Sequence, residues 1–311
     1  MNFYNINNPA EKASFRQAVL QGAASGKGLF FPEVIPRMEQ LLAKNLRDVS
    51  LPQLAARILH PFMEDDFSFE ETSEICHNAF NFKIPLVPLN GRLYSLELFH
   101  GPSLAFKDVG ARFLAQVLKK IAEKEHRRIT VLVATSGDTG SAVARSFHQT
   151  AGIDVVLLYP SGKVSELQEK TLTTMGGNVS AFEVEGDFDA CQRLVKEAFA
   201  DKEAFPELTL TSANSINIGR FLPQTTYYFR AWSQLSPEAR RDLIFSVPSG
   251  NYGNLAAGLL AYKMGLPANG FIAASNVNKV VPDYLQTGDY SPRRTVRTLS
   301  NAMDVGDPSN F

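Results

Sequence analysis

The apolar positions of this chain follow one pattern up to about residue 90 and a different pattern after it. In the first part, apolar residues recur at helical spacing over 38–47 and 54–63, and glycines lead into an aromatic group at 28–32. Spacing of this kind predicts amphipathic helices. We therefore expect residues 1–90 to form a mostly helical N-terminal region, in which the aromatic group is buried behind a loop.

After residue 91 the pattern alternates between strands and helices. Phe113, Val117 and Ile121 recur at helical spacing and predict a helix over 109–125, while the continuous apolar run at 129–134 predicts a buried strand. The same alternation predicts strands at 153–159, 179–184, 208–211, 243–247 and 270–274, and helices through 142–147, 164–174, 188–199, 221–232 and 255–264.

This alternation is typical of an α/β fold with parallel strands and helices on both faces of the sheet. A chain of 311 residues is long enough for two packed units. We place them at 91–215 and 216–311, after the N-terminal region.

Composition and charge narrow the class of protein. The formal net charge is −1, which gives no reason to expect nucleic acid or a membrane surface as a partner. Cys76 and Cys191 lie far apart, so they form neither a metal-ligand motif nor a disulfide framework. The N-terminus lacks the pattern of a signal peptide, and no apolar run approaches the roughly 20 residues of a membrane span. We expect a soluble cytoplasmic protein without a metal site.

One lysine has an unusual setting. Lys107 follows the apolar residues Leu104, Ala105 and Phe106, at the start of the helix predicted over 109–125. Burial of the amine would lower its pKa, and a lysine in that state can form a Schiff base with a carbonyl compound. The alternative is a structural lysine whose stem packs on Phe106 while its ammonium group reaches water.

Ligands of open α/β sheets bind at the carboxyl ends of the strands, where three turns here are rich in small polar residues. The first is the turn 135–140, Thr-Ser-Gly-Asp-Thr-Gly, between a strand and a helix. Its hydroxyls and the helix N-terminus would favour an anion. The alternative is a structural turn in which Asp138 or Thr139 is the N-cap.

The second turn is 248–254, Pro-Ser-Gly-Asn-Tyr-Gly-Asn, which could cradle a phosphate with main-chain amides. It matches neither the dinucleotide-binding pattern nor the P-loop. The alternative is a tight turn that needs a positive φ at Gly250 or Gly253.

The third turn covers residues 212–220. Asn214, Ser215 and Asn217 offer neutral hydrogen bonds, and Arg220 offers a forked cation, so together they could hold a second oxyanion such as a substrate phosphate. The alternative is a polar loop in which Arg220 is solvated.

Four segments, in this order along the chain, resemble the threonine synthase family of fold-type II pyridoxal-phosphate enzymes. They are the lysine segment 98–108, the loop 134–140, the segment 214–217 with Arg220, and the glycine loop 249–254. Tyr4 and the segments 28–32 and 299–304 resemble the longer bacterial and fungal branch of that family. The resemblance spans essentially the whole chain.

The resemblance implies a tryptophan synthase β-like fold, with the Schiff-base lysine in 91–215 and the cofactor-phosphate loop in 216–311. It implies that Lys107 holds pyridoxal 5′-phosphate and moves protons at Cα and Cβ of the substrate. The other residues that it implies for the cofactor are Asp138, Gly250, Asn251, Tyr252, Gly253 and Asn254. Those that it implies for the substrate are Thr135, Ser136, Gly137, Thr139, Asn214, Ser215 and Arg220.

The reaction that the resemblance implies converts O-phospho-L-homoserine and water to L-threonine and phosphate. It combines γ-elimination of phosphate with addition of water at Cβ, as the final step of threonine biosynthesis. A serine or threonine dehydratase, or a sulfhydrylase, of the same fold would not need the second phosphate site at Arg220. An inactive relative that binds the cofactor is a further alternative, and a nucleotide-binding protein is disfavoured because its fingerprints are absent.

Two departures from the family pattern stand out. Many fold-type II enzymes have Ser-Gly-Asn where this chain has Ser136, Gly137 and Asp138. Members of the branch also usually continue well past residue 311, into a part that carries the hydroxyl residue facing the pyridine nitrogen. We therefore expect a truncated sheet with an exposed edge, and a chain that folds poorly or has little activity in this form.

Overall fold

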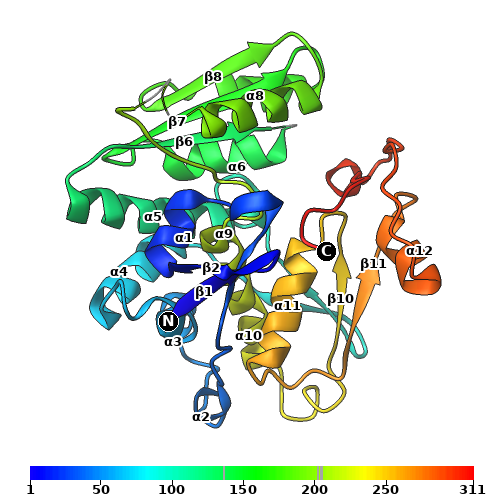
Figure 1. Cartoon of the computed structure of the whole chain (residues 1–311). Helices are drawn as coiled ribbons and strands as arrows, with labels where there is room; N and C mark the ends of the chain where they lie inside the picture. The colour runs from blue at the N-terminus through cyan, green and yellow to red at the C-terminus, as the bar shows by residue number, and fades with distance from the viewer. Residues whose placement is uncertain (136, 202, 204–205) are drawn as a thin grey trace.

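The computed structural model describes residues 1–135, 137–201, 203 and 206–311. A four-stranded α/β unit lies at one end of the molecule, and a second unit with a parallel strand pair lies at the other end (Figure 1). The N-terminal region packs beside the long helix α5 (Lys107–Glu125) of the first unit. The last residues of the chain return to the carboxyl end of the second unit's first strand (Figure 1).

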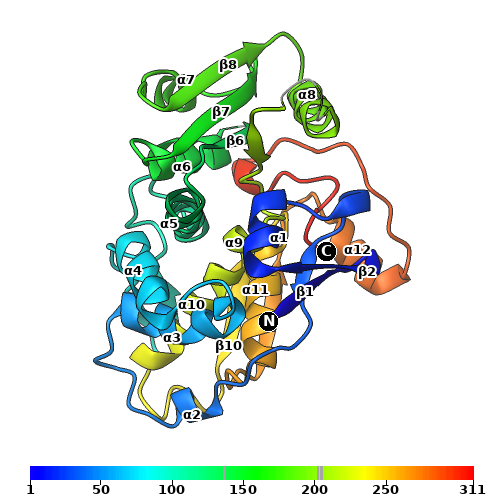
Figure 2. The same ribbon diagram turned by 60° about the vertical axis from the view of Figure 1, so that its left-hand side comes forward.

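The first unit is a parallel sheet in the order β8-β7-β6-β9. Its strands are β6 (Ile129–Ala134), β7 (Ile153–Pro160), β8 (Val179–Val184) and β9 (Thr209–Thr211). Its helices are α5 (Lys107–Glu125), α6 (Asp138–Phe147), α7 (Glu166–Thr173) and α8 (Phe188–Ala200). Helix α8 covers one face of the sheet, and α6 and α7 lie on the other (Figure 2).

Strand β6 shows why its sequence is apolar without alternation. Val131 and Val133 belong to the main core with α5 and α6, whereas Leu132 packs with Cys191 and Val195 of α8. Because both faces are covered, every side chain of the strand is buried. The predicted α/β fold with parallel strands is confirmed.

The second unit contains the parallel pair β10 (Ile244–Pro248) and β11 (Gly270–Ala274). Its helices are α9 (Ile218–Phe221), η2 (Leu222–Gln224), α10 (Thr225–Gln234), α11 (Gly253–Lys263), α12 (Val280–Thr287) and η3 (Asn301–Met303). The predicted helix over 221–232 is in fact divided, and it becomes regular only from Thr225. Pro223 lies at the division, where it cannot donate a backbone hydrogen bond.

The N-terminal region contains the expected helices and also strands that the pattern did not predict. Its helices are α1 (Phe15–Gln21), η1 (Ser25–Lys27), α2 (Glu39–Leu42), α3 (Leu51–Met63) and α4 (Phe69–Ala79). The strands β1 (Asn2–Asn5), β2 (Asn8–Ser14) and β3 (Phe30–Pro32) form an antiparallel sheet, and β4 (Leu86–Asn90) pairs with β5 (Leu93–Leu96). Phe30 is buried, as expected, but the helix expected over 38–47 is a single turn.

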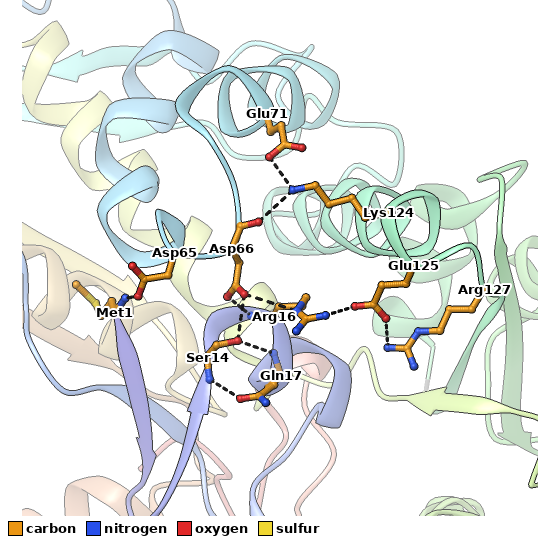
Figure 3. Close-up of polar contacts among 10 residues, drawn as sticks. All are labelled: Met1, Ser14, Arg16, Gln17, Asp65, Asp66, Glu71, Lys124, Glu125 and Arg127. Atoms are coloured by element: carbon orange, nitrogen blue, oxygen red, sulfur yellow. Dashed lines mark hydrogen bonds and ion pairs between the residues drawn. The ribbon is translucent and has the colours of Figure 1, made fainter.

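A network of polar contacts fixes the N-terminal region against the end of α5 (Figure 3). Asp66 accepts hydrogen bonds from the Arg16 backbone N–H at 2.8 Å and from Ser14 Oγ at 3.2 Å. The Arg16 guanidinium pairs with Glu125, and Lys124 Nζ donates to Glu71 at 2.8 Å. The far end of α5 is thereby held in place, and the opposite end of that helix carries Lys107.

Within the described ranges, every helix is either too short or too polar to traverse a lipid bilayer.

Candidate active site

Lys107 is the first residue of α5, and its side chain is only 19% exposed. Burial lowers the pKa of Lys107, a nearby carboxylate on Asp138 opposes this shift, and the positive charge of Arg220 adds to it. The Lys107 Nζ lies 3.8 Å from Asp138 Oδ2. The Lys107 side chain is therefore mostly removed from water, which favours the desolvated amine over a lysine whose ammonium group is solvated.

Asp108 supports the turn that precedes Lys107. Its side chain is fully buried, and its Oδ2 accepts a hydrogen bond from the Ser103 backbone N–H at 2.8 Å. A Cβ on Gly101 would stand 2.8 Å from the Asp108 Cβ, so only glycine lets this turn approach the carboxylate. Burial raises the pKa of Asp108. Asp108 was not among the predicted site residues, and its position beside Lys107 was the available signal.

Arg220 is a buried cation. It belongs to α9, is 5% exposed, and burial lowers its pKa to about 10, with the negative charge of Asp108 opposing that shift. Its guanidinium donates to the Ala213 carbonyl oxygen. Among the residues that the structure describes, no carboxylate lies within ion-pairing distance of it. The alternative of a solvated arginine is therefore wrong, and the site holds a buried positive charge that suits an oxyanion.

The loop after β6 is shaped by Thr135, which is 1% exposed. Its Oγ1 accepts hydrogen bonds from the backbone N–H groups of Gly137 at 3.0 Å and Gly140 at 2.8 Å. Gly137, with φ +136°, is the N-cap of α6, so the alternative with Asp138 or Thr139 as the N-cap is wrong. Thr139 is half-buried in the first turn of α6. Ser136 lies outside the described residues.

The Asp138 carboxylate is free for other contacts because it does not cap the helix. Its Oδ1 accepts a hydrogen bond from Gln168 Nε2 at 2.9 Å, while its Oδ2 faces Lys107. Gln168 comes from α7, thirty positions further along the chain, and was not among the predicted site residues. The Ser-x-x-Gln pattern at 165–168 was the available signal, but it predicts only the start of a helix.

The loop after β10 is held by Ser249, whose Oγ accepts from the Tyr252 backbone N–H at 3.0 Å and donates to Asn254 Oδ1 at 2.5 Å. The residue with positive φ is Tyr252, at +62°, so the alternative of a turn that needs this conformation at glycine is wrong. Gly250 and Gly253 instead allow close approach: a Cβ on Gly250 would stand 2.7 Å from the Cα and the carbonyl carbon of Met303. The loop leads directly into the N-terminus of α11.

The C-terminal segment joins this loop to the segment that carries Arg220. Asn251 Nδ2 donates to Ser215 Oγ at 2.8 Å, and Asn310 Nδ2 donates to the same oxygen at 3.2 Å. The Ser309 backbone N–H and Oγ donate to Asn251 Oδ1 at 2.7 and 2.9 Å. Asn214 is half-buried beside them. Sequence reasoning missed Ser309 and Asn310, because only the folded chain brings them to this loop.

The predicted site residues therefore lie in two groups. Lys107, Asp138 and Arg220 interact across the start of α5, and Ser215 with Asn251 joins the loops that follow β9 and β10. The segment 213–220 connects the groups, because Asn217 is the N-cap of α9 and its Nδ2 donates to the Ser212 carbonyl at 2.8 Å. A desolvated amine, a buried guanidinium and a helix N-terminus suit a carbonyl compound and two oxyanions.

Comparisons with known proteins agree with this chemistry. The family model described as pyridoxal-phosphate dependent enzyme matches residues 81–311, and the model described as threonine synthase N terminus matches residues 2–80. The structure of threonine synthase from Escherichia coli covers 100% of this chain with a TM-score of 0.92 and 49% identity, and the chain covers 72% of that protein. The PLP-bound threonine synthase from Brucella melitensis gives a TM-score of 0.92 with 37% identity, and the chain covers 68% of it.

Among curated relatives, threonine synthase from Haemophilus influenzae is 49% identical over 311 residues, which are 100% of this chain and 72% of that protein. Fold and site define a fold-type II pyridoxal-phosphate dependent enzyme. More narrowly, the chain belongs to the threonine synthase family. Structures such as maize serine racemase, at 17% identity and a TM-score of 0.57, share only the fold.

The residues present fit pyridoxal 5′-phosphate, the cofactor of this enzyme family. The Lys107 amine, whose pKa is lowered by burial, suits the cofactor's aldehyde. The loop at the start of α11 places backbone amides where a phosphate binds favourably. Membership of the family sets aside the dehydratase, sulfhydrylase and nucleotide-binding alternatives.

Proposed function

We propose that this chain carries the active site for the conversion of O-phospho-L-homoserine and water to L-threonine and phosphate. The observation that carries the proposal is the buried guanidinium of Arg220, which has no carboxylate partner among the described residues and whose positive charge acts on the Lys107 amine. A phosphorylated cofactor alone would need one anion site. A second cationic site beside the reactive lysine supports a substrate that also carries an oxyanion.

Lys107 is the residue proposed to hold the cofactor and to move protons at Cα and Cβ of the substrate. When bound, pyridoxal phosphate supplies an electron sink for negative charge at the substrate carbons. A lowered pKa supports the role of Lys107, because a general base must be partly neutral near the operating pH. The Asp138 carboxylate faces the amine and would favour the protonated form after each proton is taken up.

The other roles divide between the two groups of residues. We assign the cofactor phosphate to the loop from Gly250 to Asn254, at the N-terminus of α11. We assign the substrate phosphate to Arg220 with Asn214, Ser215 and Thr139, and the substrate carboxylate to the loop from Thr135 to Gly137. In this assignment Thr135 acts mainly by shaping its loop, because its hydroxyl is already bonded to two backbone amides.

The proposal places the reaction in the cytoplasm. Both cysteines, Cys76 and Cys191, are buried and unpaired, which suits the reducing cytoplasm. The proposed partner is the small phosphorylated substrate.

The deciding experiment combines an absorption spectrum with a product assay. Purified protein would be supplied with pyridoxal 5′-phosphate, and the visible cofactor band would be recorded before and after O-phospho-L-homoserine is added. Phosphate and threonine would then be quantified, with Lys107→Ala as the control that loses the band. Equal amounts of phosphate and threonine are expected, and a band without phosphate release would instead indicate an inactive cofactor-binding protein.

A further inference from the structure

The Gln168 side chain uses both ends of its amide. Its Oε1 accepts a hydrogen bond from the Ser165 backbone N–H at 3.0 Å, and its own backbone N–H donates to Ser165 Oγ at 3.3 Å. These two bonds form the capping box of α7. Its Nε2 points the other way and donates to Asp138 Oδ1 at 2.9 Å. The capping box uses only the Oε1 acceptor of the Gln168 side chain, so the Nε2 donor is available to the active-site loop.

The loop after β6 is fitted closely to this side chain. A Cβ on Gly137 would stand 2.6 Å from Gln168 Oε1, and Gly137 has a φ of +136° that other residues rarely adopt. Gly137 therefore adopts the required backbone conformation, and its lack of a side chain leaves room for the amide of Gln168. The Gln168 amide fills the space beside Gly137, and a different rotamer of Gln168 would leave that space empty.

The Asp138 carboxylate is divided between two partners. One oxygen is bound by Gln168, and the other lies 3.8 Å from Lys107 Nζ. The Asp138 side chain is 42% exposed, so without a second anchor it could turn toward water. An ion pair with such an exposed member is weak by itself. The charged groups that act on the Lys107 amine are Asp138 on α6 and Arg220 on α9.

We propose that Gln168 is a positioning residue, which holds the Asp138 carboxylate toward Lys107. Because Gln168 belongs to α7, the reactivity of the Lys107 amine then depends on α7 being packed in place. Gln168 acts through Asp138 and is not itself catalytic. The inference rests on the proposed function of Lys107. Its test needs neither substrate nor cofactor, so it can fail independently of the proposed reaction.

The test measures how readily the Lys107 amine reacts in cofactor-free protein. An amine-reactive acetylating reagent would be applied across a pH series, and labelling of the peptide that contains Lys107 would be followed by mass spectrometry. Gln168→Met removes the Nε2 donor and one of the two capping-box bonds, the one that Oε1 accepts from the Ser165 N–H. Ser165→Ala removes the other capping-box bond, the one that Ser165 Oγ accepts, and leaves the Nε2 donor in place. Without its anchor Asp138 turns away, the pKa of Lys107 falls, and the neutral amine becomes more abundant.

We expect Gln168→Met to speed labelling about two- to threefold at pH values below the titration midpoint, in keeping with a partly exposed ion pair. Ser165→Ala should leave the rate unchanged. Asp138→Asn should speed labelling at least as much, and adding Gln168→Met to it should have no further effect. An equal effect of Ser165→Ala, or a persisting effect in the Asp138→Asn background, would overturn the proposal.

A second measurement covers the case in which Gln168→Met does not fold. Gln168→Glu keeps the acceptor for the Ser165 N–H but places a carboxylate against Asp138. Combining it with Asp138→Asn reverses donor and acceptor, because the new amide can donate to the new carboxylate. The double variant should have a higher thermal midpoint than Gln168→Glu alone. Additive effects of the two changes would show that the two residues are not coupled.

Discussion

The guanidinium of Arg220 packs against the backbone of Gly110, three residues beyond Lys107 on the same helix. A Cβ on Gly110 would stand 3.1 Å from Arg220 Nε and 2.6 Å from the Arg220 carbonyl oxygen. Residues three apart share a helix face, so Lys107 and Gly110 both face the segment that carries Arg220. The absence of a side chain at Gly110 thus sets how closely α9, with its buried cation, packs against α5.

Gly110→Ala should therefore disturb both stability and the site. The added methyl group meets a backbone oxygen, so α9 must move away, and overpacking of this kind costs about 1–3 kcal/mol. We expect a lower urea midpoint and a weaker substrate affinity, measured as a higher KM. Gly270→Ala is the matched control, because a Cβ there meets nothing within 4 Å. If Gly110→Ala changes only stability, the close approach does not position Arg220.

Arg220→Met should separate cofactor binding from substrate binding. It keeps the length and apolar stem of the side chain but removes the charge proposed to hold the substrate phosphate. Losing one partner of a buried charged pair typically costs about 10²- to 10³-fold, and we expect that fall in kcat/KM for O-phospho-L-homoserine. The absorption band of the bound cofactor should persist.

Arg230→Met is the control for the loss of a half-buried arginine. The Arg230 Nη1 donates to the Val49 carbonyl at 3.2 Å, from a position on α10 that is not among the residues proposed to bind phosphate. It should lower stability without the same loss of kcat/KM. Equal effects of the two substitutions on kcat/KM would contradict the role of Arg220.

The predictable part of the fold was the part in which local pattern and burial agree. The run at 129–134 predicted β6 because both of its faces are covered, so the strand needed no alternation. Strand β1 was missed because it is only four residues long, and β2 was missed because its sequence is polar and does not alternate regularly. They exist through pairing, as in the register of Phe3 with Pro32, which brings together positions far apart in the chain.

The sequence was enough to predict which kinds of residue form the site. It was not enough to predict the hydrogen-bond partners of those residues. The apolar setting of Lys107 indicated a side chain removed from water, and in the structure that side chain is only 19% exposed. The capping of α6 could not be predicted, because the first-turn N–H of Gly140 is bound by the hydroxyl of Thr135, which lies before the helix, and not by Asp138. Gln168 and Asn310 reach the site only through tertiary packing, so no local pattern could place them there.

Thr135 offers a clean test of a structural role against a substrate-binding role. Thr135→Val has the same shape but leaves the N–H groups of Gly137 and Gly140 without their buried acceptor. A buried donor left unsatisfied costs about 1–3 kcal/mol, and we expect that loss in the free energy of unfolding without any ligand. Thr135→Ser keeps the hydroxyl and should retain most of the stability. A raised KM with unchanged stability in Thr135→Val would instead indicate a direct contact with substrate.

At neutral pH, the buried amine of Lys107 should lower the free energy of unfolding of the chain. Its pKa in the folded chain lies below that in the unfolded chain, so charging the amine at low pH disfavours the folded state. As pH rises through the folded pKa toward the unfolded value of about 10.4, the folded chain loses its proton first and the penalty disappears. Lys107→Met should therefore raise the thermal midpoint by on the order of a few degrees at pH 7.

The pH dependence separates this explanation from simple packing. The gain from Lys107→Met should shrink as the pH is raised toward the unfolded value of about 10.4, because the folded amine, whose pKa is lowered by burial, becomes neutral before the unfolded one. Lys163→Met removes an exposed lysine and should leave the midpoint nearly unchanged throughout. A gain that stays constant with pH would mean that the methionine stabilises only by burying more apolar surface. The loss of Asp138 as an ion-pair partner opposes the gain, but that pair is partly exposed and its contribution is small.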